Sequence, residues 1–288
     1  MASSQRTAIL LISCPDQPGL VSAVADFIRE HSGNIVYLDQ HVEKDHKAFF
    51  MRVEWEVEGF GLNDSQLATL FQADIAAPLQ MTWQLYYSDQ RPRVALLATK
   101  EGHCLYDLLS RHQAGELDVD IPLIIANRED LRDAARRFDI PFYHLPITKE
   151  NKAEQEAKQI ELLEEHRVDT VVLARYMQIL SDSFAAHYPN QIINIHHSFL
   201  PAFIGARPYH QAYERGVKII GATSHYVTAD LDEGPIIAQD VIPVSHRESI
   251  ADFIRHGKDL EKVVLARAVW AHVQRKVLVF KNKTVVFS

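Results

Sequence analysis

Two short stretches of the sequence carry side chains that can do chemistry. The first, NIHHSFLP, covers residues 194–201. Successive side chains of an extended segment alternate between faces, so Asn194 and His196 point the same way. An amide beside an imidazole can stabilise an oxygen that becomes negative when a carbonyl carbon is attacked. The pattern alone is more typical of polar residues that satisfy loop backbone at a strand end. Adjacent histidines on opposite faces make a poor metal pair, and no metal site is predicted.

The second stretch, HYVTADLDEGP, covers residues 225–235 and is strongly acidic. Asp230, Asp232 and Glu233 lie in one turn that ends at Gly234. Neighbouring like charges and burial both raise a carboxyl pKa, so we expect at least one group suited to moving protons near neutral pH. A solvated acidic turn is the alternative for this stretch alone. Together, the two stretches favour a centre that attacks a carbonyl carbon.

The elements that must position these residues follow a strand–helix rhythm from residue 92 onward. Mostly unbroken apolar strands between helices predict a parallel sheet covered on both faces. Two further strands are expected at 218–227 and 235–244, then a long helix from about Ser249 to His272 and a hairpin at 277–287. A polar stretch ending at Pro92 marks a boundary. The predicted domains are therefore residues 1–88 and 92–288.

The first domain has a different pattern. The sequence predicts the order βαββαβ: a β-rich run at the start, a helix over 20–33, a hairpin around the turn at 43–47, a helix over 65–79 and a last strand over 80–87. This is the ferredoxin-like arrangement of one sheet and two helices. The chain as a whole is expected to be an α/β protein of two domains.

The stretch CPDQPGLVSAVADFIREHSGNI resembles the opening of an ACT domain, and the match covers about residues 5–88. The resemblance implies a regulatory module that binds an amino-acid effector through Asp16, Gly19, Asn34 and Ile35. Asp16 and Gly19 would shape a turn over a helix N-terminus, whose free amides can hold a carboxylate. Alternatively, the turn only links strand to helix and the domain serves self-association. The resemblance favours a homo-oligomer, a dimer or a tetramer.

NIHHSFLPAFIGARPYHQA, followed by GATSHYVTADLDEGPII, resembles the folate-dependent formyltransferase family, with its N-x-H-x-S-x-L-P motif and D-x-G-P turn. The resemblance implies a Rossmann-like domain over 92–288. It also implies a catalytic trio of Asn194, His196 and Asp232, supported by His225. LARYMQILS resembles the loop that borders the folate pocket. The implied folate-binding residues are Met177, Gln178, Ile179 and Leu180, and, largely through backbone, Ala229, Asp230, Leu231 and Gly234.

The acceptor of the formyl group is suggested by two sequence features of other family members that this chain is expected to lack. Family members that formylate glycinamide ribonucleotide carry a glycine-rich G-x-G-S-N loop for the phosphate, where this chain has Glu101 and only Gly102. Members that formylate initiator tRNA carry an added nucleic-acid-binding domain, which we do not expect here. The resemblance therefore implies water as acceptor and hydrolysis of 10-formyltetrahydrofolate to formate and tetrahydrofolate. Such a reaction supplies formate for purine biosynthesis and balances one-carbon pools.

Two rival functions stay open at this point. One is a formyltransferase that holds an amine acceptor on an unrecognised surface. The other is a non-catalytic amino-acid sensor whose second domain has lost its activity. The presence of all three residues of the trio argues against the sensor, because no structural role requires all three.

Composition narrows the remaining possibilities. The 288 residues are 47% hydrophobic and 24% charged, with a net charge of −8, which argues against binding nucleic acid or an anionic membrane surface. The apolar runs are too short to span a membrane, and residues 1–7 do not read as a signal peptide. Cys14 and Cys104 are too few for a disulfide scaffold. We expect a cytoplasmic protein with no permanently bound cofactor and with 10-formyltetrahydrofolate as substrate.

Overall fold

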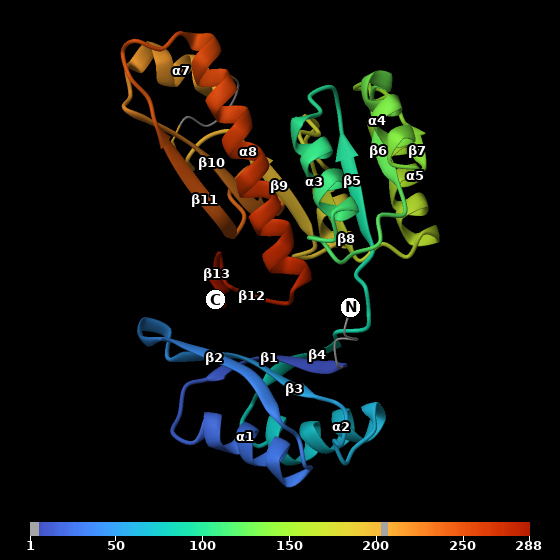
Figure 1. Cartoon of the computed structure of the whole chain (residues 1–288), viewed down its shortest axis with the longest axis vertical. Helices are drawn as coiled ribbons and strands as arrows, with labels where there is room; N and C mark the ends of the chain where they lie inside the picture. Colours follow the sequence, from blue (N-terminus) through green and yellow to red (C-terminus); the bar gives the residue numbers. More distant parts are fainter. Residues whose placement is uncertain (1–5, 203–206) are drawn as a thin grey trace. The chain divides into compact units, whose positions relative to one another are not determined.

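The computed structural model of the chain describes residues 6–202 and 207–288 (Figure 1). It divides into two compact units. Unit 1 consists of Met1–Arg91, Gln274–Leu278 and Val285–Ser288. Unit 2 consists of Pro92–Val273 and Val279–Thr284. Residues 203–206, which belong to the longer stretch that resembles the formyltransferases, lie outside the described residues.

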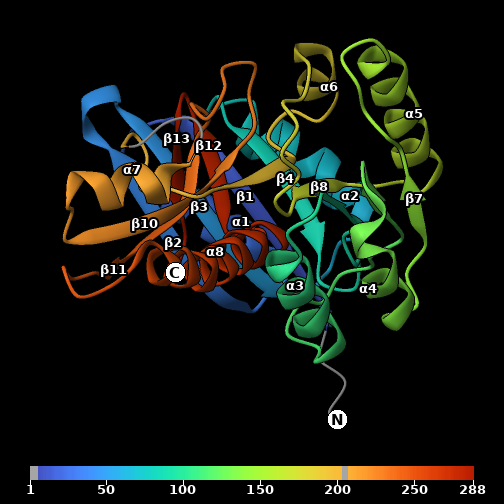
Figure 2. The same ribbon diagram turned by 90° about the horizontal axis from the view of Figure 1, so that it is seen from above.

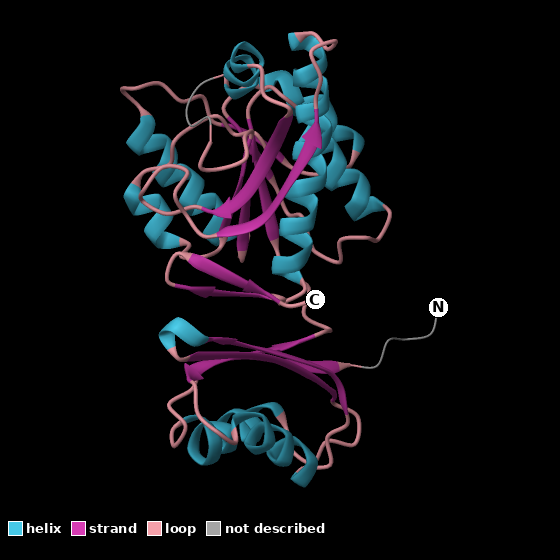
Figure 3. Ribbon diagram, turned by 90° about the vertical axis from the view of Figure 1, so that its left-hand side faces the viewer, coloured by secondary structure: helices cyan, strands magenta, loops and turns pink. Residues whose placement is uncertain are grey.

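Unit 1 has the predicted βαββαβ order. Its elements are β1 (Thr7–Pro15), α1 (Leu20–Glu30), β2 (Ile35–Glu43), β3 (Ala48–Glu56), α2 (Asp64–Leu70) and β4 (Thr82–Tyr87). The four strands form an antiparallel sheet in the order β2-β3-β1-β4. Both helices cover one face of this sheet (Figure 3). The ferredoxin-like prediction is therefore confirmed.

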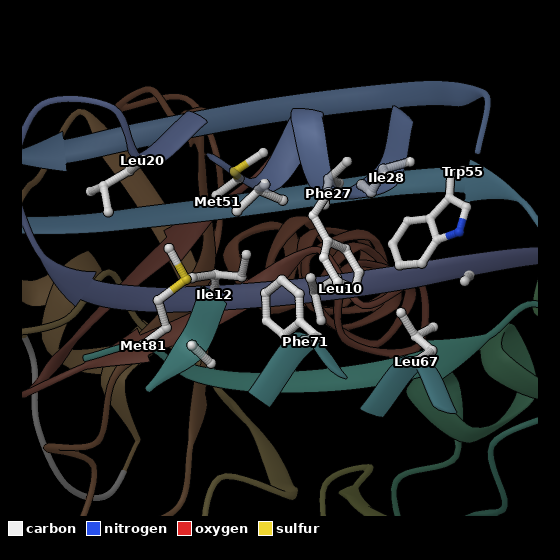
Figure 4. Close-up of a cluster of buried hydrophobic side chains, with 14 of the residues drawn as sticks. Leu10, Ile12, Leu20, Phe27, Ile28, Met51, Trp55, Leu67, Phe71 and Met81 are labelled. Atoms are coloured by element: carbon white, nitrogen blue, oxygen red, sulfur yellow. The ribbon is translucent and has the colours of Figure 1, made fainter. Parts of the chain in front are cut away.

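The core of unit 1 lies between that sheet and its helices (Figure 4). Phe27 of α1 packs edge-on against Phe71, with ring centroids 5.5 Å apart. The second helix differs from the prediction, because after α2 the chain continues as a π-helix from Phe71 to Ala76. The wider turn puts Phe71 and Ala76, five residues apart, on the same buried side.

The C-terminal end of the chain contributes to unit 1. Arg52 of β3 is only 3% exposed. Its guanidinium pairs with Glu54 at 2.8 Å and donates to the backbone carbonyl of Arg275 at 3.1 Å. Tyr37 donates its hydroxyl proton to the carbonyl of Ser288 at 2.6 Å. Charge-assisted bonds from a buried arginine are among the stronger ones in proteins, so this end of the chain is firmly held.

Unit 2 alternates strands and helices as predicted. Its elements are β5 (Val94–Ala98), α3 (His103–Gln113), β6 (Ile124–Ala126), α4 (Arg132–Arg137), β7 (Phe142–His144), α5 (Lys152–Glu165), β8 (Thr170–Leu173), α6 (Asp182–His187), β9 (Ile192–His196), α7 (Pro208–Arg215), β10 (Ile219–Tyr226), β11 (Ile236–Pro243) and α8 (Ile250–Val273). The predicted hairpin follows as β12 (Val277–Phe280) and β13 (Lys283–Val286). Among the described helices, none has the length and hydropathy needed to cross a membrane.

The seven strands of unit 2 have the order β11-β10-β9-β8-β5-β6-β7. Strands β5 to β9 pair in parallel, whereas β10 and β11 are antiparallel additions. Helices α3 and α8 cover one face, and α5 and α6 cover the other (Figure 2). The chain turns back at β5, from which β6 and β8 lie on opposite sides. In open α/β sheets ligands bind at the carboxyl ends of the strands where the order reverses, so this edge is where a site is expected.

Candidate active site

Strands β9 and β10 bring the two polar stretches together. They pair antiparallel, with His225 opposite Asn194 and Thr223 opposite His196. The register therefore puts Asn194 and His225 side by side. Residues two apart share a face, as expected, and both histidines are nearly buried, His196 at 5% and His225 at 2% exposed. The strand pairing alone fixes three of the four predicted polar groups.

Asp232 is positioned by the loop between β10 and β11. Its backbone has a positive φ of 58°, a left-handed conformation that aspartate adopts more readily than most residues. Two residues later the chain passes against β10, where a Cβ on Gly234 would lie 1.8 Å from the carbonyl oxygen of Tyr226. Only glycine allows this approach. The loop is thereby folded back so that Asp232 meets the histidines.

The carboxylate of Asp232 contacts both histidines. Its Oδ2 lies 3.2 Å from Nδ1 of His196, and its Oδ1 lies 3.6 Å from Nε2 of His225. The other ring nitrogen of His196, Nε2, is buried and has no hydrogen-bond partner among the described residues. An imidazole whose Nδ1 is held by a carboxylate has a fixed orientation. Nε2 is thus free to act on a bound molecule.

The predicted electrostatics of the acidic loop were wrong in sign. Burial raises the pKa of the Asp232 carboxyl, but the neighbouring imidazoles of His196 and His225 outweigh it and lower that pKa below its usual range. Asp230 and Glu233 are exposed and point to solvent rather than crowding Asp232. Opposite charge from histidines, not like charge from carboxylates, therefore dominates here. Asp232 is ionised at neutral pH.

His225 orients the amide of Asn194. Its Nδ1 lies 2.8 Å from the carbonyl oxygen of Tyr226, which can only accept, so Nδ1 carries a proton. Its Nε2 lies 3.3 Å from Nδ2 of Asn194. An amide nitrogen carries two N–H groups. One of them faces His225, and the other is available to a ligand.

Three of these four residues, Asn194, His196 and Asp232, line a cavity of about 620 Å³. Of the eight predicted folate residues, four line it: Met177, Gln178, Ile179 and Leu231. Met177, Ile179 and Leu231 are more than half exposed, an unusual state for large apolar side chains. An apolar rim around convergent polar groups is typical of a small-molecule site.

The other four predicted folate residues lie away from the cavity wall. Leu180 packs against the buried core of unit 2. Ala229 and Asp230 are exposed, and Gly234 is buried against Tyr226. Successive residues of an irregular loop point in different directions. A sequence motif therefore marks the loop without saying which of its side chains face the ligand.

Sequence reasoning missed a charged group in the cavity wall. Arg175 follows β8 with a positive φ of 64°. Its Nε lies 3.4 Å from Oε2 of Glu261 on α8, which is 1% exposed. Glu261 also accepts from Tyr209 at 2.6 Å and contacts Nε2 of His103 at 2.7 Å. Arg175 lies within the quoted LARYMQILS stretch and is its one basic residue, a signal that was available. No pattern in the sequence around Glu261 indicates that this residue lies in the cavity wall.

One group of potential metal ligands lies close together in the described residues. It consists of His103, Cys104 and Glu261. Burial raises the pKa of the Cys104 thiol well above its usual value, which opposes the thiolate that a metal needs. The oxygens of Glu261 are already occupied by Tyr209 and His103. These contacts explain the cluster as an internal hydrogen-bond network, and the absence of a metal stays a prediction.

The four predicted effector residues of unit 1 fall into two places. Gly19 caps the start of α1 with φ 92°, next to the exposed Asp16. Asn34 and Ile35 lie past the other end of this 11-residue helix, which is about 16 Å long. The amide of Asn34 donates to Glu56 at 2.8 Å. One copy of unit 1 therefore does not bring the two pairs together.

His197, next to the trio, gives a stability prediction. Burial lowers its pKa to about 4, and Arg175 adds to that effect, whereas Glu261 and Asp232 act in the opposite direction. The unfolded chain, with a histidine pKa near 6.5, binds the extra proton between pH 6.5 and 4 and the folded chain does not, so stability falls as pH drops through this range. We expect a loss of up to about 3 kcal/mol.

The measurement compares the wild type with His197→Gln. Urea unfolding at several pH values should show that the variant loses less free energy of unfolding than the wild type between pH 6.5 and 4. Parallel curves for the two proteins would contradict the expectation. His187, a more exposed histidine on α6 that contacts Glu164 at 2.9 Å, provides the control. Because an exposed ion pair contributes at most about 1 kcal/mol, the curve of His187→Gln should stay close to that of the wild type.

The chain matches the family model described as formyl transferase over residues 92–269 and the model described as ACT domain over residues 8–74. It is 56% identical over 282 residues to a formyltetrahydrofolate deformylase from Synechocystis, covering 98% of this chain and 99% of that protein.

Two further similarities cover nearly the whole chain. A formyltetrahydrofolate deformylase from Bacillus subtilis is 50% identical over 97% of this chain and 93% of its own length. The crystal structure of a formyltetrahydrofolate deformylase from Pseudomonas syringae superimposes with a TM-score of 0.97 at 47% identity. That match covers 100% of this chain and 96% of the other. The sequence is therefore similar over nearly the whole chain to both proteins, and the arrangement of elements is similar to that of the Pseudomonas syringae structure.

Proposed function

The chain belongs to the formyltetrahydrofolate deformylase family, and on that premise we propose that Asn194, His196 and Asp232 hydrolyse 10-formyltetrahydrofolate to formate and tetrahydrofolate. The observation that carries this assignment is the contact of 3.2 Å between Asp232 and Nδ1 of His196, with Nε2 of His196 left without a partner beside Asn194. The folate would occupy the cavity, with its pterin against Met177, Ile179 and Leu231.

The first role is stabilisation of the formyl oxygen. Nδ2 of Asn194 and Nε2 of His196, when it carries a proton, donate hydrogen bonds to this oxygen as the carbonyl carbon becomes tetrahedral. Donors fixed before the reaction need no reorganisation when the charge develops, and each is worth about 10²–10³ in turnover. His225 holds the amide of Asn194 in this orientation.

The second role is handling of the water proton by Asp232. The Asp232 carboxylate is in its basic form throughout the physiological pH range. Bound folate excludes water from the cavity, which strengthens the effect of burial and raises the proton affinity of this carboxylate. Asp232 takes a proton from the attacking water, directly or through one bound water. The new C–O bond forms, the C–N10 bond breaks, and Asp232 returns the proton to N10. The formic acid released loses its own proton to solvent at neutral pH.

The test is formate release without any added acceptor. Purified protein incubated with 10-formyltetrahydrofolate alone is expected to release formate and tetrahydrofolate in equal amounts. Glycinamide ribonucleotide, added in excess, should neither speed the loss of substrate nor become formylated. A reaction that needs an added amine would identify a transferase instead, and folate binding without turnover would favour a sensor.

Other aspects follow from the same assignment. We propose residues 92–288 as the catalytic domain and residues 1–88 as a regulatory or oligomerisation domain, with an amino-acid effector near Asp16, Gly19, Asn34 and Ile35. Because one copy separates these residues, an effector touching all four would need a second copy, which agrees with a homo-oligomer. A cytoplasmic location, the lack of a permanent cofactor and the lack of nucleic-acid or membrane partners stay predictions. Adding single amino acids to the formate assay tests the effector.

A further inference from the structure

The cavity contains a cationic group that the proposed reaction does not use. Arg175 lines the same wall as Asn194, His196 and Asp232. Strand β8 pairs with β9 so that Leu173 lies opposite Asn194. Arg175 therefore follows, two residues later, at the same edge of the sheet as the trio. Its side chain is 12% exposed.

The guanidinium of Arg175 is positioned by Glu261 on α8. Glu261 lies 3.4 Å from its Nε and is itself fixed by Tyr209 and His103. Burial raises the pKa of Glu261, but His103 and Arg175 outweigh it and lower that pKa, so the carboxylate is charged. Gly257 makes room for the Tyr209 ring, since a Cβ there would lie 2.0 Å from it. The arginine is thus anchored rather than mobile.

The anchored guanidinium still has unused hydrogen-bonding capacity. Nε and Nη1 are buried and have no hydrogen-bond partner among the described residues. The contact of Nε with Glu261 is long and not in hydrogen-bond geometry. A buried donor left unpaired costs about 1–3 kcal/mol, and guanidinium donors are best matched by carboxylate oxygens. These groups therefore suit a small carboxylate at the wall of the cavity.

We propose that Arg175 binds the formate produced by the reaction. This inference rests on the proposed hydrolysis, which generates the smallest carboxylate at a carbon held beside Asn194 and His196. The other product, tetrahydrofolate, carries no new charge at N10. An anion released between Asp232 and Glu261 is repelled by both carboxylates, and Arg175 provides the compensating charge. Arg175 is accordingly a product-binding residue.

The experiment measures formate affinity in two ways. Sodium formate is tested as an inhibitor of hydrolysis, and binding of [¹³C]formate to the protein without folate is followed by NMR line width. Sodium chloride and sodium acetate at equal ionic strength are the controls. Arg175→Gln should raise the inhibition constant for formate at least about tenfold, the loss expected for one charged hydrogen bond. Formate should inhibit the wild type more strongly than chloride.

The matched variant is Glu261→Gln, which breaks the same contact from the other side. It keeps the guanidinium and removes the neighbouring negative charge, so formate should bind more tightly. If Arg175 only stabilised the fold, both variants would weaken formate binding alike, and the inference would be wrong. Should Arg175→Gln fail to fold, Arg175→Lys, which keeps a charge but loses the guanidinium donors, and Glu261→Gln still decide the question.

Two further results separate the alternatives. If Arg175→Gln raises KM for 10-formyltetrahydrofolate but leaves the formate inhibition constant unchanged, Arg175 holds the glutamate carboxylate of the folate, and the inference fails. If neither the wild type nor any variant hydrolyses the substrate, but [¹³C]formate binding still depends on Arg175, the proposed function fails and the anion site stands. If the wild type hydrolyses the substrate but binds no formate at concentrations up to those at which chloride inhibits, the anion site is overturned and the proposed function stands.

Discussion

Asp232→Asn is expected to lower the rate of formate release by about 10²–10⁴, the usual contribution of a positioned proton-transfer group. The variant keeps the size of the side chain but removes the charge that contacts His196 at 3.2 Å. Nδ1 of His196 then loses its ionic partner and the water loses its proton acceptor. Initial rates of formate release from 10-formyltetrahydrofolate at neutral pH measure the effect.

Glu233→Gln is the matched control. Glu233 is the next residue in the same loop, but it is exposed, so turnover should stay within about twofold of the wild type, the range in which surface changes usually fall. Folate affinity should change little in either variant, because the apolar rim at Met177, Ile179 and Leu231 is untouched. Asp232→Asn retaining more than a tenth of the wild-type rate would contradict the assignment.

Combining substitutions gives a sharper check of the same pair. His196→Ala alone should cost about 10²–10³ in turnover. Because His196 and Asp232 are in direct contact, their effects are not independent. The double variant should therefore lose much less than the product of the two single losses. If the loss of turnover in the double variant equals the product of the two single losses, the two residues act independently.

Gly234→Ala is expected to be the most damaging change outside the trio. The added Cβ would lie 1.8 Å from the oxygen of Tyr226 and 2.9 Å from its carbonyl carbon. Both partners are backbone, so no side chain can move aside and the loop must shift. The same oxygen contacts Nδ1 of His225 at 2.8 Å, so the orientation of that ring is disturbed as well.

The shift of the loop acts on both stability and turnover. A displacement of about 1 Å in a catalytic group can cost 10²-fold, and Asp232 lies only two residues before the glycine. Overpacking of this kind costs about 1–3 kcal/mol of stability. We expect at least about 100-fold slower formate release at a temperature where thermal unfolding shows the variant to be folded.

Gly115→Ala is the control that distinguishes the steric clash expected in Gly234→Ala from the general effect of replacing a glycine. Gly115 has φ 77°, and a Cβ there meets nothing within 4 Å. It should cost about 1 kcal/mol through backbone strain and leave turnover unchanged. Wild-type turnover in Gly234→Ala would show that the loop tolerates displacement and that Asp232 is not held where the proposal needs it.

The sequence by itself determined the order of the elements and the positions of the trio along the chain. A period of two on a strand fixes that Asn194 and His196 share a face, and the alternation of apolar strands with helices fixes a mostly parallel sheet. Both are local consequences of side-chain direction. The motif also predicts a folate loop at 177–180, and three of its four side chains line the cavity. Leu180 instead packs against the core, because the direction of a side chain in an irregular loop depends on what packs beneath it.

Only the tertiary structure decided which charges meet. At least one carboxyl pKa in the acidic turn was expected to rise from the neighbouring carboxylates, but the pKa of Asp232 falls because β9, β10 and the loop bring two histidines to it. Arg175 and Glu261 are 86 positions apart in the sequence and meet only when α8 packs on the sheet. Arg52 likewise finds the carbonyl of Arg275 far along the chain. Burial and distance set the strength of such contacts, and neither quantity exists until the chain has folded.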